Sequence, residues 1–329
     1  MSKPLRIGMI GIGGRGYLAH AAHRPEEGVR VVAGADPNTA TFADFHAGFG
    51  PDAFTTTDYR ALLARPDVDA VLIVSPDFCH EEHAVAALEA KKAVYLEKPM
   101  AITIAGCDHI LAAARDHGAK LYLGHNMRHF AMVRRMKQLI DAGEIGEVRA
   151  GWCRHFVSYG GDAYFKDWHA ERKNTTGLLL QKGAHDIDIL HWLCGGYTRR
   201  VTAMGGLSVY NRTTDRRPAD DPGNKKWVPA NWPPLSQKLM SPAMDVEDLS
   251  MMLMELSNGV QCSYQQCHFT PDSCRNYTII GTGGRLENFG DNHGVVRLWN
   301  HRTDTYKGQG DEEYPFEPGH GGHGGADTL

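Results

Sequence analysis

Long hydrophobic runs are missing from this sequence. No stretch of its 329 residues reaches the ~20 consecutive apolar residues that a membrane-spanning helix needs. The first residues, Met1 to Leu5, also lack the apolar segment of a secretory signal. We therefore expect a cytoplasmic protein with no membrane partner.

A surplus of basic charge is missing as well. Lys and Arg number 35 against 39 Asp and Glu, which gives a formal net charge of -4. Proteins that bind nucleic acid usually carry a basic face or an overall basic balance. The composition therefore gives no reason to expect a nucleic-acid partner, and a small-molecule substrate is the class of ligand that remains.

Cysteine is scarce, and the seven cysteines are scattered, odd in number and without a close CxxC pair. This usage is typical of reduced thiols, so we expect neither disulfides nor zinc. His320 and His323 have a spacing that suits metal ligands, but they lie in a glycine-rich tail without nearby Cys or carboxylate ligands. Ordering such a tail is costly, and we expect no metal site.

A chain of 329 residues exceeds what one core usually fills, which predicts two domains. Short apolar runs alternate with helical segments up to residue 123, a pattern typical of parallel strands joined by helices. We expect an α/β domain over residues 1–123, a Rossmann doubly wound parallel sheet. Its predicted strands are 6–10, 29–33, 70–74, 93–96 and 120–123, and its helices include 81–90 and 104–116.

The remaining residues, 124–329, have a different pattern. Helices are expected at 132–141 and 178–193, and strands at 148–157, 249–256, 260–266, 276–280 and 294–299. The strands are joined by turns, which predicts an α+β domain with a largely antiparallel open sheet. Residues 211–242 lack periodicity and indicate a long loop, which either covers a cleft or is solvated.

The first predicted strand is followed by a GxGxxG motif, formed by Gly11, Ile12, Gly13, Gly14, Arg15 and Gly16. The glycines permit a tight turn and close approach of the backbone to a dinucleotide pyrophosphate. Asp36 ends the second strand, where an acid binds the ribose diol. Because a carboxylate repels a 2'-phosphate and no Arg or Lys follows it, NAD is favoured over NADP.

Two more motifs lie at predicted strand ends, where doubly wound sheets bind ligands. Ser75, Pro76 and His80 follow the third strand, and Glu97-Lys98-Pro99 follows the fourth. With these motifs, with residues 124–128 and with the Gly-x-His segment that ends at His185, the sequence resembles the Gfo/Idh/MocA family. Glucose-fructose oxidoreductase and inositol dehydrogenase belong to that family.

The resemblance implies a role for individual residues. Lys98 would lie near the nicotinamide ribose and polarise the reacting hydroxyl, and His185 would act as general base. Many family members carry Asp where this sequence has Gln181, which binds a hydroxyl but cannot share a proton. Asp188 either orients His185 or pairs with a cation. Contacts with cofactor or substrate are further implied for Ser75, Pro76, His80, Glu97, Asn126 and Arg128, and Pro99 is expected in a strained or cis turn.

An aromatic and polar cluster spans residues 164–169. Tyr164, Trp168 and His169 would suit a sugar site, where an aromatic face covers a ring and polar groups bind hydroxyls. The same cluster would equally suit a packed loop.

The sequence thus predicts an NAD-dependent oxidoreductase acting on a secondary hydroxyl of a sugar, cyclitol or related polyol. An NAD-dependent glycosidase that works by transient oxidation and a non-enzymatic NAD-responsive sugar sensor are the alternatives. The resemblance also implies a homodimer or homotetramer, formed through the antiparallel sheet. Because family members usually continue past a similar His-Gly tail, we expect further sequence after Leu329.

Overall fold

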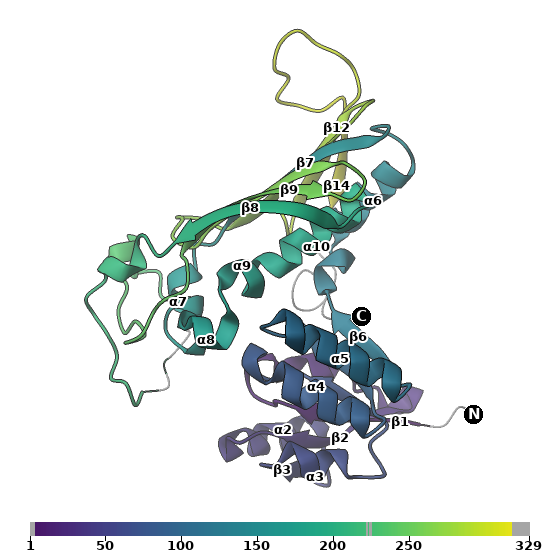
Figure 1. The fold of residues 1–329 in the computed structure, drawn as a ribbon, viewed down its shortest axis with the longest axis vertical. Helices are drawn as coiled ribbons and strands as arrows, with labels where there is room; N and C mark the ends of the chain where they lie inside the picture. The colour runs from purple at the N-terminus through teal and green to yellow at the C-terminus, as the bar shows by residue number, and fades with distance from the viewer. Residues whose placement is uncertain (1–3, 222, 224–225, 318–329) are drawn as a thin grey trace. The chain divides into compact units, whose positions relative to one another are not determined.

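The computed structural model describes residues 4–221, 223 and 226–317 (Figure 1). Its contacts divide the chain into two compact units, the first ending at His125 and the second beginning at Asn126. The tail that contains His320 and His323 lies outside the described residues. Among the residues described, no helix combines the length and the apolar character required to span a bilayer.

The first unit is built on a parallel sheet of six strands in the order β3-β2-β1-β4-β5-β6. The strands are β1 (Leu5–Ile10), β2 (Val29–Ala35), β3 (Phe54–Thr56), β4 (Ala70–Ile73), β5 (Ala93–Glu97) and β6 (Leu121–Gly124). The chain winds outward from β1 in one direction and from β4 in the other, which confirms the doubly wound sheet. The predicted strands are all present, and only the short edge strand β3 was not predicted.

Helices connect these parallel strands. They are α1 (Leu18–Ala22), α2 (Phe42–Phe49), α3 (Tyr59–Leu63), α4 (His80–Glu89) and α5 (Ile104–Asp116). The hydroxyl of Thr103 caps α5 by accepting a hydrogen bond from the backbone N–H of Gly106 at 2.9 Å. Three consecutive β4 residues, Val71 to Ile73, are buried, as expected for a central strand covered on both faces.

The second unit contains an eight-stranded sheet in the order β14-β13-β12-β11-β7-β10-β9-β8. Only β7 and β10 pair in parallel, which confirms a largely antiparallel sheet. The strands are β7 (Val148–Phe156), β8 (Thr198–Gly206), β9 (Leu249–Leu256), β10 (Gln261–Cys267), β11 (Cys274–Gly281), β12 (Arg285–Phe289), β13 (Gly294–Trp299) and β14 (Glu312–Phe316). Of these, β8, β12 and β14 were not predicted.

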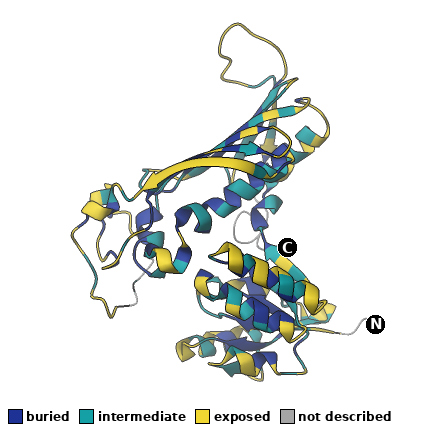
Figure 2. Ribbon diagram, in the orientation of Figure 1, coloured by how far each residue is buried: buried dark blue, intermediate teal, exposed yellow. Residues whose placement is uncertain are grey.

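The helices of the second unit are α6 (Ala131–Asp141), α7 (Gly160–Tyr164), α8 (Arg172–Thr175), α9 (Leu178–Gln181) and α10 (Gly183–Cys194). Of these, α6 and α10 pack on one face of the sheet. Buried side chains of α6 and α10 form one core with inward-facing residues of the strands. The alternation is clear on β9, where Met252 and Met254 are buried while Met251 and Leu253 are exposed. The neighbouring edge strand β8 is exposed along nearly all of its length (Figure 2). The sheet therefore has one face in the core and one open face.

The prediction of one continuous helix over 178–193 was wrong. The segment is divided into α9 and α10, with Lys182 between them. A Cβ added at Gly183 would lie 3.0 Å from the ring of Tyr264, so glycine is what permits the close packing of the chain on β10 at this point. The break thus coincides with a close approach of the chain to β10, which the local helical pattern does not indicate.

Candidate active site

The glycine-rich loop of the first unit follows β1. Gly11 has a φ of +86°, and a Cβ added to it would lie 2.9 Å from the backbone N of Ser75. A side chain at Gly11 is thus excluded by the loop that follows β4. At Gly14, by contrast, an added Cβ would meet no atom within 4 Å. Packing of the chain does not require glycine there, whereas a dinucleotide pyrophosphate that approaches the loop backbone does.

Asp36, at the end of β2, is oriented by this loop. Its Oδ2 accepts a hydrogen bond from the backbone N–H of Ile12 at 3.0 Å, and its Oδ1 accepts one from the N–H of Asn38 at 2.9 Å. Both bonds fix the carboxylate beside the glycines. The loop and Asp36 together fit the pyrophosphate and the ribose diol of NAD.

Arg15 and Glu97 connect the glycine loop to the end of β5. Arg15 Nη2 lies 3.1 Å from Oε1 of the buried Glu97, and Glu97 Oε2 accepts a hydrogen bond from the backbone N–H of Lys98 at 3.2 Å. The peptide bond between Lys98 and Pro99 is cis, one of the two turn geometries expected for Pro99. The Lys98 segment is thereby held at the carboxyl edge of the sheet, where the sequence placed it.

His80 holds two of these loops together. Its Nδ1 lies 2.7 Å from the carbonyl oxygen of Pro99, and its Nε2 lies 2.9 Å from that of Ser75. Burial lowers the pKa of the imidazole, and the contacts with the two carbonyl oxygens oppose this shift. This geometry is that of a positioning residue; a direct contact of His80 with cofactor stays a prediction.

In the second unit, Asn126 and Arg128 lie in a 3-10 helix (Asn126–His129) and His185 lies in the first turn of α10. Arg128 binds Asp188 through two nitrogens, Nε to Oδ2 at 2.7 Å and Nη2 to Oδ1 at 2.6 Å. The ion pair of Asp188 with a cation is thus present, and the orientation of His185 by Asp188 stays a prediction. Gln181, at the end of α9, and His185 are both buried.

The aromatic cluster is partly a packed structure. Phe165 is fully buried against Tyr210 in a small separate core. Trp168 stacks on His169, with ring centroids 3.6 Å apart, and His169 Nδ1 lies 2.8 Å from Asp167 Oδ1. Substrate contacts for Tyr164, Trp168 and His169 stay a prediction.

A buried polar network was not predicted from the sequence. Asp186, on α10, is completely buried. Its Oδ2 accepts hydrogen bonds from Tyr264 at 3.0 Å and from His155 Nδ1 at 3.0 Å. Its Oδ1 accepts hydrogen bonds from Arg275 Nε at 3.1 Å and from Tyr277. Burial opposes ionisation of this carboxyl, but these partners outweigh burial and hold its pKa well below the usual range. Burial lowers the pKa of His155 to about 4, so that imidazole is neutral at pH 7.

The residues of this network come from α10 and from three neighbouring strands, β7, β10 and β11. The one local signal is the spacing of Arg275 and Tyr277 on β11, which puts both side chains on the same face of the strand. Nothing in the sequence around Asp186 indicates that these strands meet it.

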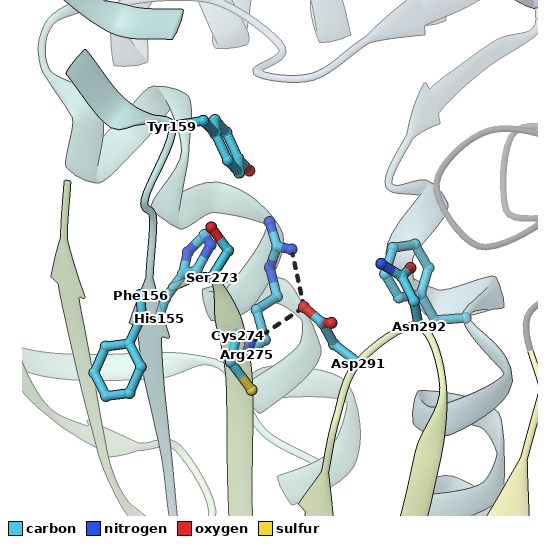
Figure 3. A pocket seen from close by; sticks show the side chains of 9 residues that line it. His155, Phe156, Tyr159, Ser273, Cys274, Arg275, Asp291 and Asn292 are labelled. Carbon is cyan, nitrogen blue, oxygen red and sulfur yellow. Dashed lines mark hydrogen bonds and ion pairs between the residues drawn. The ribbon is translucent and has the colours of Figure 1, made fainter. Parts of the chain in front are cut away.

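Beside the network is a cavity of about 310 Å³ within the second unit (Figure 3). Phe130, His155, Phe156, Tyr159, Ser273, Cys274, Arg275, Asp291 and Asn292 line it. The guanidinium of Arg275 lies between Ser273 and Asp291, and the hydroxyl of Tyr159 lies above it in Figure 3. The lining is mostly polar and so offers hydrogen-bond partners to a ligand that carries hydroxyl groups.

Two family models match the chain. Residues 5–125 match the oxidoreductase family with an NAD-binding Rossmann fold, GFO_IDH_MocA, and residues 133–287 match the Gfo/Idh/MocA C-terminal domain. The chain is 36% identical to inositol 2-dehydrogenase of Ralstonia nicotianae over 194 residues, 58% of this chain and 55% of the relative. It is 33% identical to 1-carboxy-3-chloro-3,4-dihydroxycyclo hexa-1,5-diene dehydrogenase of Comamonas testosteroni over 213 residues, 64% of this chain and 52% of the relative.

The alignments thus span about half the length of these curated relatives. Among solved structures, the chain is similar to levoglucosan dehydrogenase in complex with NADH and levoglucosan, with a TM-score of 0.78 and 22% identity over 99% of this chain and 87% of that one. At this identity the likeness shows a shared fold.

Proposed function

Because the chain belongs to the Gfo/Idh/MocA oxidoreductase family, with an NAD-binding Rossmann domain, we propose that it transfers hydride between NAD and a secondary hydroxyl of a sugar, cyclitol or related polyol. The observation that carries the proposal is the fixed carboxylate of Asp36 beside the open backbone of the glycine loop. The dehydrogenase names of the two curated relatives, both of ring alcohols, support the class of substrate.

When bound, NAD supplies the acceptor of the hydride. Lys98, which follows the buried Glu97, polarises the hydroxyl oxygen as negative charge develops on it. His185 accepts the hydroxyl proton, and Gln181 binds a hydroxyl by hydrogen bonding. Arg128 is held by Asp188 and contacts the substrate. These roles are part of the proposal.

We also propose that two copies of the chain associate through the open face of the eight-stranded sheet. Met204 on β8 and its neighbours Met251 and Leu253 on β9 are 76%, 44% and 65% exposed. Apolar side chains grouped on one open sheet face favour association of this kind.

The test is a substrate panel of sugars, anhydrosugars, glycosides and cyclitols, incubated with NAD and separately with NADP while reduced nicotinamide is followed by absorbance. We expect reduction of NAD with one substrate class, and its loss in Lys98→Ala and His185→Ala. Lys120→Ala and His117→Ala, at exposed positions of the first unit, are the matched controls. Cleavage of a glycoside without net reduction would instead identify a redox-assisted glycosidase, and NAD binding without any turnover would identify a sensor.

A further inference from the structure

Lys182 is a buried cation whose partners are phenols. Its Nζ donates a hydrogen bond to Tyr159 Oη at 3.2 Å and lies 5.5 and 5.6 Å from the ring centroids of Tyr159 and Tyr164. Among the described residues it has no carboxylate partner. Because a buried ammonium is costly unless it is paired, its charge favours a negative group nearby.

Arg275 presents a second buried cation to the same region, with its side chain 10% exposed. Its Nε donates to Asp186, and Nη1 lies 3.9 Å from Asp291 Oδ2, beyond hydrogen-bond distance. Within the described part of the chain, neither Nη1 nor Nη2 makes a hydrogen bond. The outer edge of the guanidinium, with two parallel donors, therefore faces the cavity (Figure 3).

The charges of this region do not balance. Among its deeply buried groups, Lys182 and Arg275 are positive and Asp186 is negative, which leaves one positive charge. Asp291 also lines the cavity and lies 3.9 Å from Arg275 Nη1, but its side chain is 20% exposed, so it attracts this cation less strongly than a fully buried carboxylate would. A monoanion would neutralise the excess among the deeply buried groups, whereas the second charge of a dianion would have no deeply buried cation left to pair with.

We propose that the cavity binds a carboxylate of the substrate, so that the substrate class is an acidic sugar or cyclitol such as a uronate or an aldonate. The outer nitrogens of Arg275 bind the carboxylate as a fork. The hydroxyl of Tyr159 donates a hydrogen bond to it, and Lys182 holds this hydroxyl and supplies the compensating charge. This inference rests on the proposed function, which supplies the reaction. The binding of a carboxylate is argued from the cavity alone.

The protonation of Tyr159 makes the proposed carboxylate binding depend on pH. The ammonium of Lys182, together with Arg275, lowers the pKa of Tyr159 despite burial and the opposing charge of Asp186. Burial raises the pKa of the neighbouring Tyr164, and His155 is neutral. Because only the protonated phenol donates to a carboxylate, binding is complete below the pKa of Tyr159 and weakens as the pH rises through it.

The experiment is calorimetric binding to the full chain without turnover. The probes are methyl glycosides of several hexuronates, the matching neutral hexosides, and the matching hexose 6-phosphates. We expect one uronate to bind ~10-fold or more tightly than its neutral counterpart. Lys182→Met should abolish this preference, Lys182→Arg should retain it, and Lys173→Met, at an exposed site on α8, should not change it.

Tyr159→Phe should remove the alkaline weakening of uronate binding, an effect that a purely structural role would not produce. Equal affinity for uronates and neutral hexosides, or no uronate binding, would overturn the inference, and so would tighter binding of the 6-phosphates. If Lys182→Met does not fold, the inference is still tested by the comparison of uronates with neutral hexosides and by the pH profile of Tyr159→Phe. Because binding is measured without NAD reduction, failure of hydride transfer would count against the proposed function alone.

Discussion

The guanidinium of Arg275 and the carboxylate of Asp186 form a buried ion pair, with Nε and Oδ1 3.1 Å apart. Asp186 is completely buried and also accepts hydrogen bonds from two tyrosines. The pair joins α10 to β11 and lies beside the cavity.

Asp186→Asn should destabilise the second unit strongly, because it removes the fully buried carboxylate that pairs with Arg275 and accepts hydrogen bonds from Tyr264 and Tyr277. The expected loss is roughly 3–5 kcal/mol in the free energy of unfolding, measured by denaturant titration. Asp272→Asn, at an exposed loop position, should change it by less than ~0.5 kcal/mol. A variant at Asp186 as stable as the parent would show that the pair contributes little.

The same pair predicts the sign of a pH dependence. The pKa of Asp186 is lower in the folded chain than the ~3.9 expected for an unfolded one. Its contribution to stability is therefore present above about pH 4 and is lost as the pH falls toward the folded pKa. Unfolding measured between pH 7 and pH 3 should show a decline that Asp186→Asn reduces; parallel curves for the two proteins would contradict this.

Asp36→Ala should weaken NADH binding by roughly 1.5–3 kcal/mol, because it removes a charged acceptor of the ribose hydroxyls. NADPH binding should weaken less or improve, since the repulsion of the 2'-phosphate is lost. Quenching of protein fluorescence on titration with each nucleotide measures both. Asp44→Asn, exposed on α2, is the control. An unchanged preference between the two nucleotides would show that Asp36 does not select NAD.

Gly14→Ala and Gly11→Ala should affect different properties of the protein, the first NADH binding and the second the stability of the fold. An added Cβ at Gly14 meets no atom of the chain, so this variant should fold normally but bind NADH more weakly, because the methyl group would obstruct the pyrophosphate. At Gly11 the Cβ meets the backbone of Ser75 and the φ is +86°, so the fold itself should be destabilised.

Thermal unfolding and NADH titration separate these two effects. Gly206→Ala, where a Cβ also meets no atom, is the control outside the first unit. Normal NADH binding by Gly14→Ala would contradict the assignment of the loop to the pyrophosphate.

Leu253→Glu should weaken self-association, because it puts a charge in the middle of the open sheet face. Sedimentation velocity over a range of protein concentrations should show a shift from a larger species to the monomer. Ser257→Glu, in the turn after β9, is the comparison. Retention of the same assembly by Leu253→Glu would place the interface elsewhere.

By itself, the sequence determined the features that depend on neighbouring residues. Apolar periodicity located every strand of the first unit except β3 and predicted α5 with its observed bounds, because strands and amphipathic helices of this length carry a local pattern. The glycine loop and Asp36 were recognised for the same reason, since their spacing along the chain is what a dinucleotide requires.

Only the tertiary structure decided the features that depend on distant residues. The strands that were missed in the second unit include two at the sheet edges, β8 and β14, where exposure removes the apolar alternation and Pro315 is tolerated. The division between α9 and α10 lies next to Gly183, which packs against Tyr264 of a distant strand. Asp186 and Arg275, 89 residues apart in the chain, meet because β11 pairs with β7 under α10, and no local pattern encodes such a pairing.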